Sequence, residues 1–288
     1  METILQLFKK FFFNQEKKTI KIDAAVFSNP GNVRNNHEDN YLLGHGQYIS
    51  ENQQRSMINS YVTSSYVYEG EEGVFAVCDG MGGHMSGERA SSMAVRWLDS
   101  AYDALLVSDK EQIERYVSMM NQDICSYAKT HIECRDMGST LAAILVTNRG
   151  LYCFHVGDSR IYGFSGGHIL RLTTDHTEGQ KLLDLNMLTI QELERFKKRK
   201  HLYRYLGYPG VLIPDVKKLE IAEGSYLLCS DGVTDLLEDQ ILEKILSENN
   251  GSAIIGEKIL ERALGMNGRC TDNVTVMVIC ITFGREKV

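Results

Sequence analysis

The sequence has few of the features that mark secreted, membrane-spanning or multidomain chains. Only three of its 288 residues are proline, and it contains no linker rich in proline or serine, no internal repeat and no low-complexity segment. Its seven cysteines include no CxxC pair, which argues against a zinc or redox centre and fits a reducing compartment. No apolar run is long enough to span a bilayer. We therefore expect a soluble protein of the cytoplasm.

The sequence also has fewer basic than acidic residues, 31 against 38. The formal net charge is −7 at pH 7, which argues against a nucleic-acid partner. We divide the chain into an N-terminal tail, 1–19, and a single domain, 20–288. Lysines interrupt the apolar residues of the tail, so it lacks the unbroken core of a signal peptide. The tail is either flexible or docked on a partner, and the alternative is a short amphipathic helix through which residues 1–18 contact a membrane surface.

Several short apolar runs end in, or begin with, an aspartate. The segment 74–83 reads VFAVCDGMGG, a buried strand followed by a glycine turn, which places Asp79 at the end of the strand. The segment 226–232 presents Asp231 in the same way, and Asp272 directly precedes the last apolar run. One such aspartate could simply cap a turn. Three of them predict a shared site for a hard divalent cation, which prefers oxygen ligands and offsets carboxylate repulsion.

The rest of the chain alternates between the strand and helix periodicities. We expect strands at 19–27, 41–43, 74–79, 140–146, 151–156, 160–164, 168–172, 225–229 and 274–283. We expect helices over 86–101, 113–128, 239–248 and 252–264, helical composition over 177–200, and a hairpin or long loop without chemistry over 44–73. The four closely spaced strands between 140 and 172 predict an antiparallel meander. Strands cluster with strands and helices with helices, so the fold class is α+β with an antiparallel core.

With these residues assembled, the chain resembles the metal-dependent protein serine/threonine phosphatases of type 2C, in their compact bacterial form. The resemblance covers about residues 22–283. It rests on seven motifs in the family's order: V-R-x-x-x-E-D, D-G-M-G-G-H, M-G-S-T, G-D-S-R, T-x-D-H, S-D-G and D-N-V-T. It implies a four-layer fold, in which a sandwich of two antiparallel β-sheets is flanked on both sides by α-helices.

The resemblance also implies a metal centre. Asp79 would bridge two Mn²⁺ or Mg²⁺ ions, and Gly80 would contribute its carbonyl oxygen. Glu38 would complete the shell of one ion, while Asp231 and Asp272 would hold the other. A set of oxygen ligands favours Mg²⁺ or Mn²⁺ over zinc.

Further roles follow from the same resemblance. Asp136 would hold a third, weaker ion, Asp39 would orient a metal-bound water, and Arg34 would grip the substrate phosphate. The G-D-S-R motif at 157–160 would give structural support. Residues 177–207 match a mobile segment beside the catalytic cleft, which we call the flap.

The implied activity is hydrolysis of phosphoserine and phosphothreonine in proteins. A hydroxide activated by two metals would attack phosphorus in line, without a phospho-enzyme. We expect a monomer whose partners are a cytoplasmic serine/threonine kinase and that kinase's substrates. Two alternatives stay open: an enzyme dedicated to one small regulatory partner, and a catalytically inactive binding module. The presence of all three strand-end aspartates argues against the inactive module.

The chain departs from the family pattern in a few places. Met81 stands where eukaryotic relatives have a histidine after the Asp-Gly pair, so His84, or water at a third ion, would donate the proton to the leaving group. The segment between residues 39 and 75 is longer than in the compact bacterial form. His37 is expected to be a solvated loop residue. The basic run 197–200 is either a solvated face or a contact for an acidic substrate.

Overall fold

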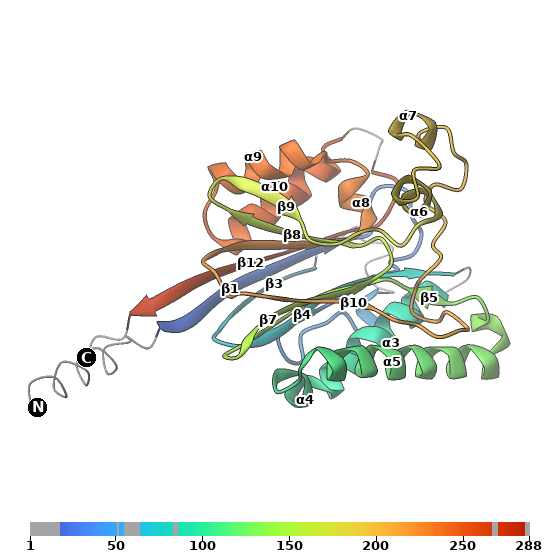
Figure 1. Cartoon of the computed structure of the whole chain (residues 1–288), viewed down its shortest axis with the longest axis horizontal. Coiled ribbons are helices and arrows are strands. Elements are labelled where there is room, and N and C mark those ends of the chain that lie inside the picture. The colour runs from blue at the N-terminus through green and yellow to red at the C-terminus, as the bar shows by residue number, and fades with distance from the viewer. Residues whose placement is uncertain (1–17, 51, 55–63, 83–85, 267–269, 286–288) are drawn as a thin grey trace, which may run out of the picture.

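Two antiparallel sheets pack face to face, and each carries helices on its outer side (Figure 1). The computed structural model describes residues 18–50, 52–54, 64–82, 86–266 and 270–285. The four layers are those expected of the α+β class, so the predicted fold is confirmed. None of the described helices is long and apolar enough to cross a membrane.

The first sheet has the strand order β3-β1-β12-β11-β8-β9. Its strands are β1 (Lys18–Asn29), β3 (Ser64–Gly70), β8 (Arg160–Ser165), β9 (His168–Arg171), β11 (Gly224–Cys229) and β12 (Val274–Arg285). Strand β1 starts inside the segment assigned to the tail and pairs with β12 over its whole length. This long central pair joins the two ends of the described chain.

The second sheet has the order β10-β7-β6-β4-β2, and the short β5 pairs with the end of β4. Its strands are β2 (Asp39–Leu43), β4 (Gly73–Met81), β5 (Gly138–Ser139), β6 (Leu141–Thr147), β7 (Gly150–Val156) and β10 (Asp215–Leu219). Strand β4 lies inside the sheet, and its residues 73–78 are buried, as the continuous apolar sequence predicts.

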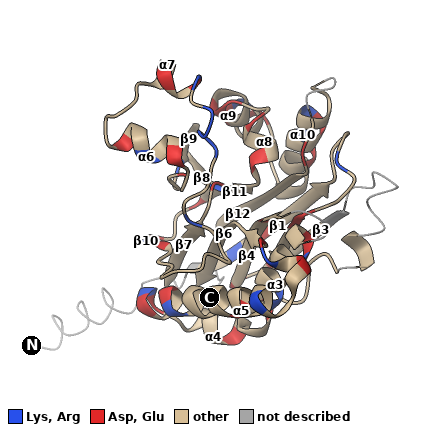
Figure 2. Ribbon diagram, turned by 90° about the vertical axis from the view of Figure 1, so that its right-hand side faces the viewer, with Lys and Arg blue, Asp and Glu red and all other residues tan. Residues whose placement is uncertain are grey.

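Helices cover the outer face of each sheet. The second sheet is covered by α3 (Ser86–Ser100), α4 (Tyr102–Leu106) and α5 (Lys110–Thr130), and the first by α8 (Asp231–Thr234), α9 (Asp239–Glu248) and α10 (Ser252–Leu264). A short 3₁₀ turn, η1 (Ile132–Cys134), follows α5. The flap carries α6 (Glu178–Asp184) and α7 (Ile190–Leu193), and a basic stretch follows α7, blue in Figure 2.

Alternation along β4 explains how one strand serves two hydrophobic cores. Val74, Ala76 and Cys78 pack toward the helices, whereas Phe75 and Val77 pack between the sheets. Successive side chains of a strand point to opposite faces, so a period of two places one set in each core. Each fully buried valine or phenylalanine side chain contributes about 1.5–3 kcal/mol. Packing on both faces therefore holds the end of β4, and with it Asp79, in place.

The structure departs from the sequence predictions in three details. The strands between 140 and 172 do not form one meander, because β6 and β7 pair in the second sheet while β8 and β9 pair in the first. The chain crosses between the sheets at Gly157, whose φ of +105° favours glycine. The segment 44–73, predicted as a hairpin or long loop, contains β3, which pairs with β1 at the edge of the first sheet. Strand β10 was not predicted at all.

Candidate active site

All eight predicted site residues meet at one end of the sandwich. A cleft of about 750 Å³ is lined by seven of them: Arg34, Glu38, Asp79, Gly80, Asp136, Asp231 and Asp272. The eighth, Asp39, is buried on β2 and lies directly opposite Asp79 of β4 in the strand register. Met81 also lines the cleft, whereas His84 lies outside the described residues.

The backbone of Asp79 is fixed by the M-G-S-T motif. Its N–H donates to Thr140 Oγ1 at 2.9 Å, and its carbonyl accepts from the Thr140 N–H at 2.8 Å. Ser159 of the G-D-S-R motif bonds Thr140 Oγ1 at 2.6 Å in turn. Two of the motifs therefore hold the end of β4 without contributing a ligand themselves.

Two glycines allow Glu38 to approach the strand end. A Cβ on Gly80 would lie 2.1 Å from the Gly87 carbonyl oxygen, and a Cβ on Gly87 would lie 2.5 Å from Glu38 Oε1. Glu38 Oε1 is buried and has no hydrogen-bond partner in the described part of the chain. A buried carboxylate oxygen without a partner is costly, and a cation ligated there would satisfy it.

Asn273 holds the loop that carries Arg34 and Glu38. Its Oδ1 accepts from the Glu38 N–H at 2.7 Å, and its Nδ2 donates to the carbonyl oxygens of Pro30 and Asn36, both at 2.9 Å. Asn273 belongs to the D-N-V-T motif, but no role was predicted for it. The sequence did contain a signal for this role: a side-chain amide, which offers both donors and an acceptor, directly follows the candidate ligand Asp272.

The prediction that His37 is a solvated loop residue is wrong. The side chain is fully buried, with Nε2 3.0 Å from Ser28 Oγ, and burial lowers its pKa to about 4. Ser28 also bonds Thr275 of β12 at 2.6 Å. The loop between β1 and β2 thus folds onto the first sheet through partners that are distant in sequence.

Arg34 lies at the mouth of the cleft. Its guanidinium donates to Asp272 Oδ2 at 2.7 Å, and the two side chains keep 45% and 40% of their surface exposed. The hydrogen bond to Asp272 raises the pKa of Arg34 further, so the group is always charged. A partly exposed guanidinium that leans on a candidate ligand can also meet an anion in the cleft.

Carboxylates in the cleft repel one another. Burial, reinforced by Glu88 nearby, raises the pKa of Glu38 to about 7. Burial, reinforced by Asp272 and Asp231, raises the pKa of Asp39 to about 7, although Ser230 donates to Asp39 at 2.8 Å.

The pKa of Asp79 is raised still more clearly, through burial and then through Asp39 and Asp231. A binuclear centre of hard cations would relieve this repulsion. The oxygen donors, the tight glycine cradle and the partnerless Glu38 oxygen therefore fit Mg²⁺ or Mn²⁺.

Asp158 lines the cleft, although its motif was expected to give only structural support. Burial, followed by the charges of Asp231 and Asp175, raises its pKa to about 7. The crossing of the chain between the sheets at Gly157 carries Asp158 to this end of the sandwich. The sequence pattern of a hairpin turn concealed this placement.

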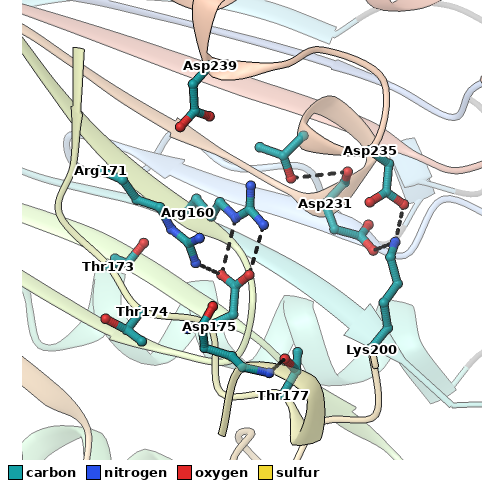
Figure 3. A network of polar contacts seen from close by, with 12 residues as sticks. Arg160, Arg171, Thr173, Thr174, Asp175, Thr177, Lys200, Asp231, Asp235 and Asp239 are labelled. Atoms are coloured by element: carbon teal, nitrogen blue, oxygen red, sulfur yellow. Dashed lines mark hydrogen bonds and ion pairs between the residues drawn. The ribbon is translucent and has the colours of Figure 1, made fainter. Parts of the chain in front are cut away.

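Arg160 of the same motif does have a structural contact. It donates to both Asp175 oxygens, from Nε at 3.2 Å and from Nη2 at 2.9 Å, and Arg171 bonds the same carboxylate (Figure 3). Asp175 belongs to the T-x-D-H motif, so the two motifs are joined by a bidentate ion pair. This network lies between β8 and the start of the flap.

The flap is tied to the body at both ends. The His176 N–H donates to the Gly157 carbonyl at 2.9 Å, and His176 Nδ1 accepts from the Gly157 N–H at 3.0 Å. The hydrogen bond from His176 lowers the pKa of Asp215 to about 2, and Arg204 donates to Asp215 at 3.0 Å. His155, His176 and Asp215 are close enough to share a metal, but Arg204 already neutralises the carboxylate. The cluster serves as a clamp on the flap.

Lys200 joins the flap to a candidate metal ligand. Its Nζ donates to Asp231 Oδ2 at 3.1 Å and also bonds Asp235 (Figure 3). One member of the predicted basic run 197–200 therefore lines the cleft and forms ion pairs there, although its side chain stays 48% exposed. Lys200 also separates the cleft from a smaller cavity of about 280 Å³ beneath the flap.

Known proteins resemble this chain in sequence. The family model "Protein phosphatase 2C" matches residues 62–250. The protein phosphatase PhpP of Streptococcus pneumoniae is 30% identical over 234 residues, which cover 79% of this chain and 93% of that protein. The sequence thus has relatives over most of its length.

Solved structures share the fold of this chain. The crystal structure of the serine/threonine phosphatase PstP/Ppp of Mycobacterium tuberculosis is 29% identical, with a TM-score of 0.73 over 90% of this chain and 98% of that one. The catalytic domain of PstP in complex with two manganese ions is also 29% identical, with a TM-score of 0.72 over 92% of this chain and 100% of that one.

The fold and the site define a phosphatase, a hydrolase of phosphate esters with a metal centre. The chain belongs to the protein phosphatase 2C family. This confirms the resemblance to metal-dependent protein phosphatases that the seven motifs indicated.

Proposed function

We propose that this chain hydrolyses phosphoserine and phosphothreonine in proteins with two Mn²⁺ or Mg²⁺ ions. The observation that carries the proposal is the meeting of strand-end carboxylates from both sheets with a guanidinium in one cleft. The PhpP and PstP proteins support it, since their names describe protein and serine/threonine phosphatases and one structure holds two manganese ions.

Asp79 would bridge the two ions, with the Gly80 carbonyl and Glu38 on one side and Asp231 and Asp272 on the other. All five residues line the cleft. Asp136, at its margin, is the candidate ligand of a third, weaker ion. When bound, such a pair of ions supplies an acidified water nucleophile and charge stabilisation for in-line displacement at phosphorus.

The chain's own residues would orient the substrate and hold a proton. Arg34 can rotate from Asp272 toward a phosphate, because planar guanidinium and phosphate oxygens form paired, charge-assisted hydrogen bonds. Asp39 is held by Ser230 behind Asp79, so it can hold or release a proton at the base of the cleft. His84 stays a candidate proton donor from sequence alone.

The wider setting follows from this chemistry. A phosphatase of this kind opposes a serine/threonine kinase, and the kinase and its substrates are the partners we propose. We assign the chain to the cytoplasm as a monomer with one domain, 20–288, and place membrane contact through residues 1–18 as the alternative for its tail. Seven scattered cysteines, all free, support a reducing compartment.

The direct test is phosphate release from a phosphothreonine peptide by purified protein. We expect release with Mn²⁺ or Mg²⁺, none with chelator, and at least a ~100-fold lower rate for Asp231→Asn, since one ligand carboxylate is lost. A phosphotyrosine peptide of the same sequence is the substrate control. Folded protein that releases no phosphate from phosphoserine or phosphothreonine would refute the proposal and favour the binding module or the dedicated enzyme.

A further inference from the structure

Another cavity adjoins the cleft at Asp136 and Tyr205. It has a volume of about 300 Å³ and lies between the end of α5, the turn after η1 and the last residues of the flap. Asp136 and Tyr205 line both this cavity, which we call the side groove, and the cleft. A chain bound with one residue in the cleft can therefore continue along the side groove.

Two cations line the side groove without a carboxylate partner. Lys129 and Arg135 are exposed, and neither forms an ion pair with a carboxylate in the described part of the chain. Asp136 is the single acidic residue of the lining. The side groove thus carries an excess of positive charge on a chain whose net charge is −7.

A purely structural explanation covers only one of the cations. Lys129 stands in the last turn of α5, where a positive charge stabilises the negative end of the helix. Arg135 lies beyond that helix and lines the same cavity. Two cations that reach one cavity from different segments are better explained by an anionic ligand.

The walls suit a polypeptide more than a free anion. Tyr205 packs edge-on against Tyr208, with ring centroids 5.7 Å apart, and both rings line the cleft. Ala128, Met137 and Pro209 add apolar surface to the side groove. Apolar walls with charges near the exposed rim match an extended chain with alternating side chains.

We propose that the side groove binds the residues that flank the phosphorylated residue of a polypeptide substrate, and that Lys129 and Arg135 select acidic side chains there. This inference rests on the proposed phosphatase function, because it uses the continuity of the side groove with the cleft. The substrates are phosphorylated segments with an acidic residue a few positions from the phosphate.

The test uses phosphothreonine peptides that differ at one flanking position. Either glutamate or lysine is placed at each of about five positions on both sides of the phosphothreonine, which covers the reach of an extended chain. We expect glutamate to exceed lysine in kcat/KM by about threefold to tenfold, at one or two positions on one side, as suits partly exposed ion pairs. The difference should lie mainly in KM and shrink between about 0.05 M and about 0.3 M salt.

Charge variants assign the preference to the side groove. Arg135→Glu, alone or with Lys129→Glu, should reverse the preference, and Arg135→Gln should weaken it. Arg115→Glu is the matched control, because Arg115 is exposed on the same helix as Lys129 but does not line the side groove. It should keep the wild-type preference.

Equal hydrolysis of all peptides within twofold, or a preference that survives Arg135→Glu, would overturn this inference and leave the phosphatase function intact. If no peptide is hydrolysed with Mn²⁺, the proposed function fails, and this inference fails with it.

Discussion

Asn273 shows how one side chain can position several parts of a site. It bonds the backbone at Pro30, Asn36 and Glu38, and it follows the candidate ligand Asp272 in sequence. The loop between β1 and β2 has no regular structure of its own over most of its length. Its placement, and so that of Arg34 and Glu38, depends on this amide.

Asn273→Ala removes three hydrogen bonds and leaves buried backbone groups unpaired. We expect a loss of about 1–3 kcal/mol in the free energy of unfolding and at least a ~10-fold loss in kcat/KM. Chemical denaturation and peptide hydrolysis measure the two effects. The control is Asn250→Ala, an exposed asparagine, which should change neither. Wild-type activity in Asn273→Ala would show that the loop is held by other contacts.

Gly87 is the second residue on which the site depends. A Cβ there would lie 2.5 Å from Glu38 Oε1 and 2.6 Å from Glu38 Cδ, so the carboxylate would have to move. We expect Gly87→Ala to weaken Mn²⁺ binding by about tenfold, because the added methyl group would displace the Glu38 carboxylate. A tenfold loss in affinity corresponds to roughly 1.4 kcal/mol. Calorimetric titration measures the affinity. Gly163→Ala, where the nearest atom is 3.6 Å away, is the control and should bind Mn²⁺ normally.

At the scale of elements, the flap is held at its two ends and at Lys200. The bridge between Thr177 and Leu202 closes its base, and Lys200 reaches across to Asp231 and Asp235 (Figure 3). Between these points the flap carries only two short helices with few buried side chains. Such a segment opens at low free-energy cost.

Lys200→Ala should make the flap easier to open in metal-free protein. Partly exposed ion pairs contribute about 0.2–1 kcal/mol each, so amide exchange over residues 178–201 should become about twofold to tenfold faster. Lys198→Ala removes a neighbouring exposed lysine and should leave exchange unchanged. Unchanged exchange in Lys200→Ala would show that the backbone contacts at the base hold the flap alone.

The sequence predicted the strand-end aspartates correctly because their signals are local. An apolar run, an aspartate and a glycine turn stand next to one another at Asp79, and β4 follows that pattern. The crossing between sheets at Gly157 was missed because a hairpin turn and a crossing turn have similar sequences. The burial of His37 was missed because its partners, Ser28 and Thr275, lie on strands that meet only in the fold.

At the scale of the whole molecule, the candidate centre joins the two sheets. Asp79 ends β4 of the second sheet, Asp231 follows β11 of the first sheet, and Asp272 precedes β12. Ions bound there would link the sheets at one end, and ligand binding to the folded state adds about 2.7 kcal/mol of stability at 100 times Kd. Without ions, the negative charges of these buried carboxylates repel one another.

The metal-free protein should therefore become more stable as the pH falls from 8 to about 6.5. The folded-state pKa of Asp39 and Asp158 is about 7, above the unfolded value near 4, so the folded state takes up protons in this window and the unfolded state does not. We expect a gain of about 1 kcal/mol in the free energy of unfolding. Below pH 6.5 the buried His37 and His155, whose pKa values are lowered to about 4, offset the gain.

Thermal melts in chelator across this range measure the effect. Saturating Mn²⁺ should remove it, because cations bound in the cleft favour the deprotonated form of the carboxylates around them. A metal-free protein whose stability falls steadily from pH 8 to 6.5 would show that the carboxylates are not mutually destabilised.

Calorimetric titration of the metal-free protein with Mn²⁺ measures whether carboxylates from both sheets form one binuclear centre. We predict two tightly bound ions in the wild-type protein and the loss of both in Asp79→Asn, since Asp79 is the residue that we propose as the shared ligand. A protein that binds no Mn²⁺, or an Asp79→Asn variant that binds two ions with unchanged affinity, would contradict it.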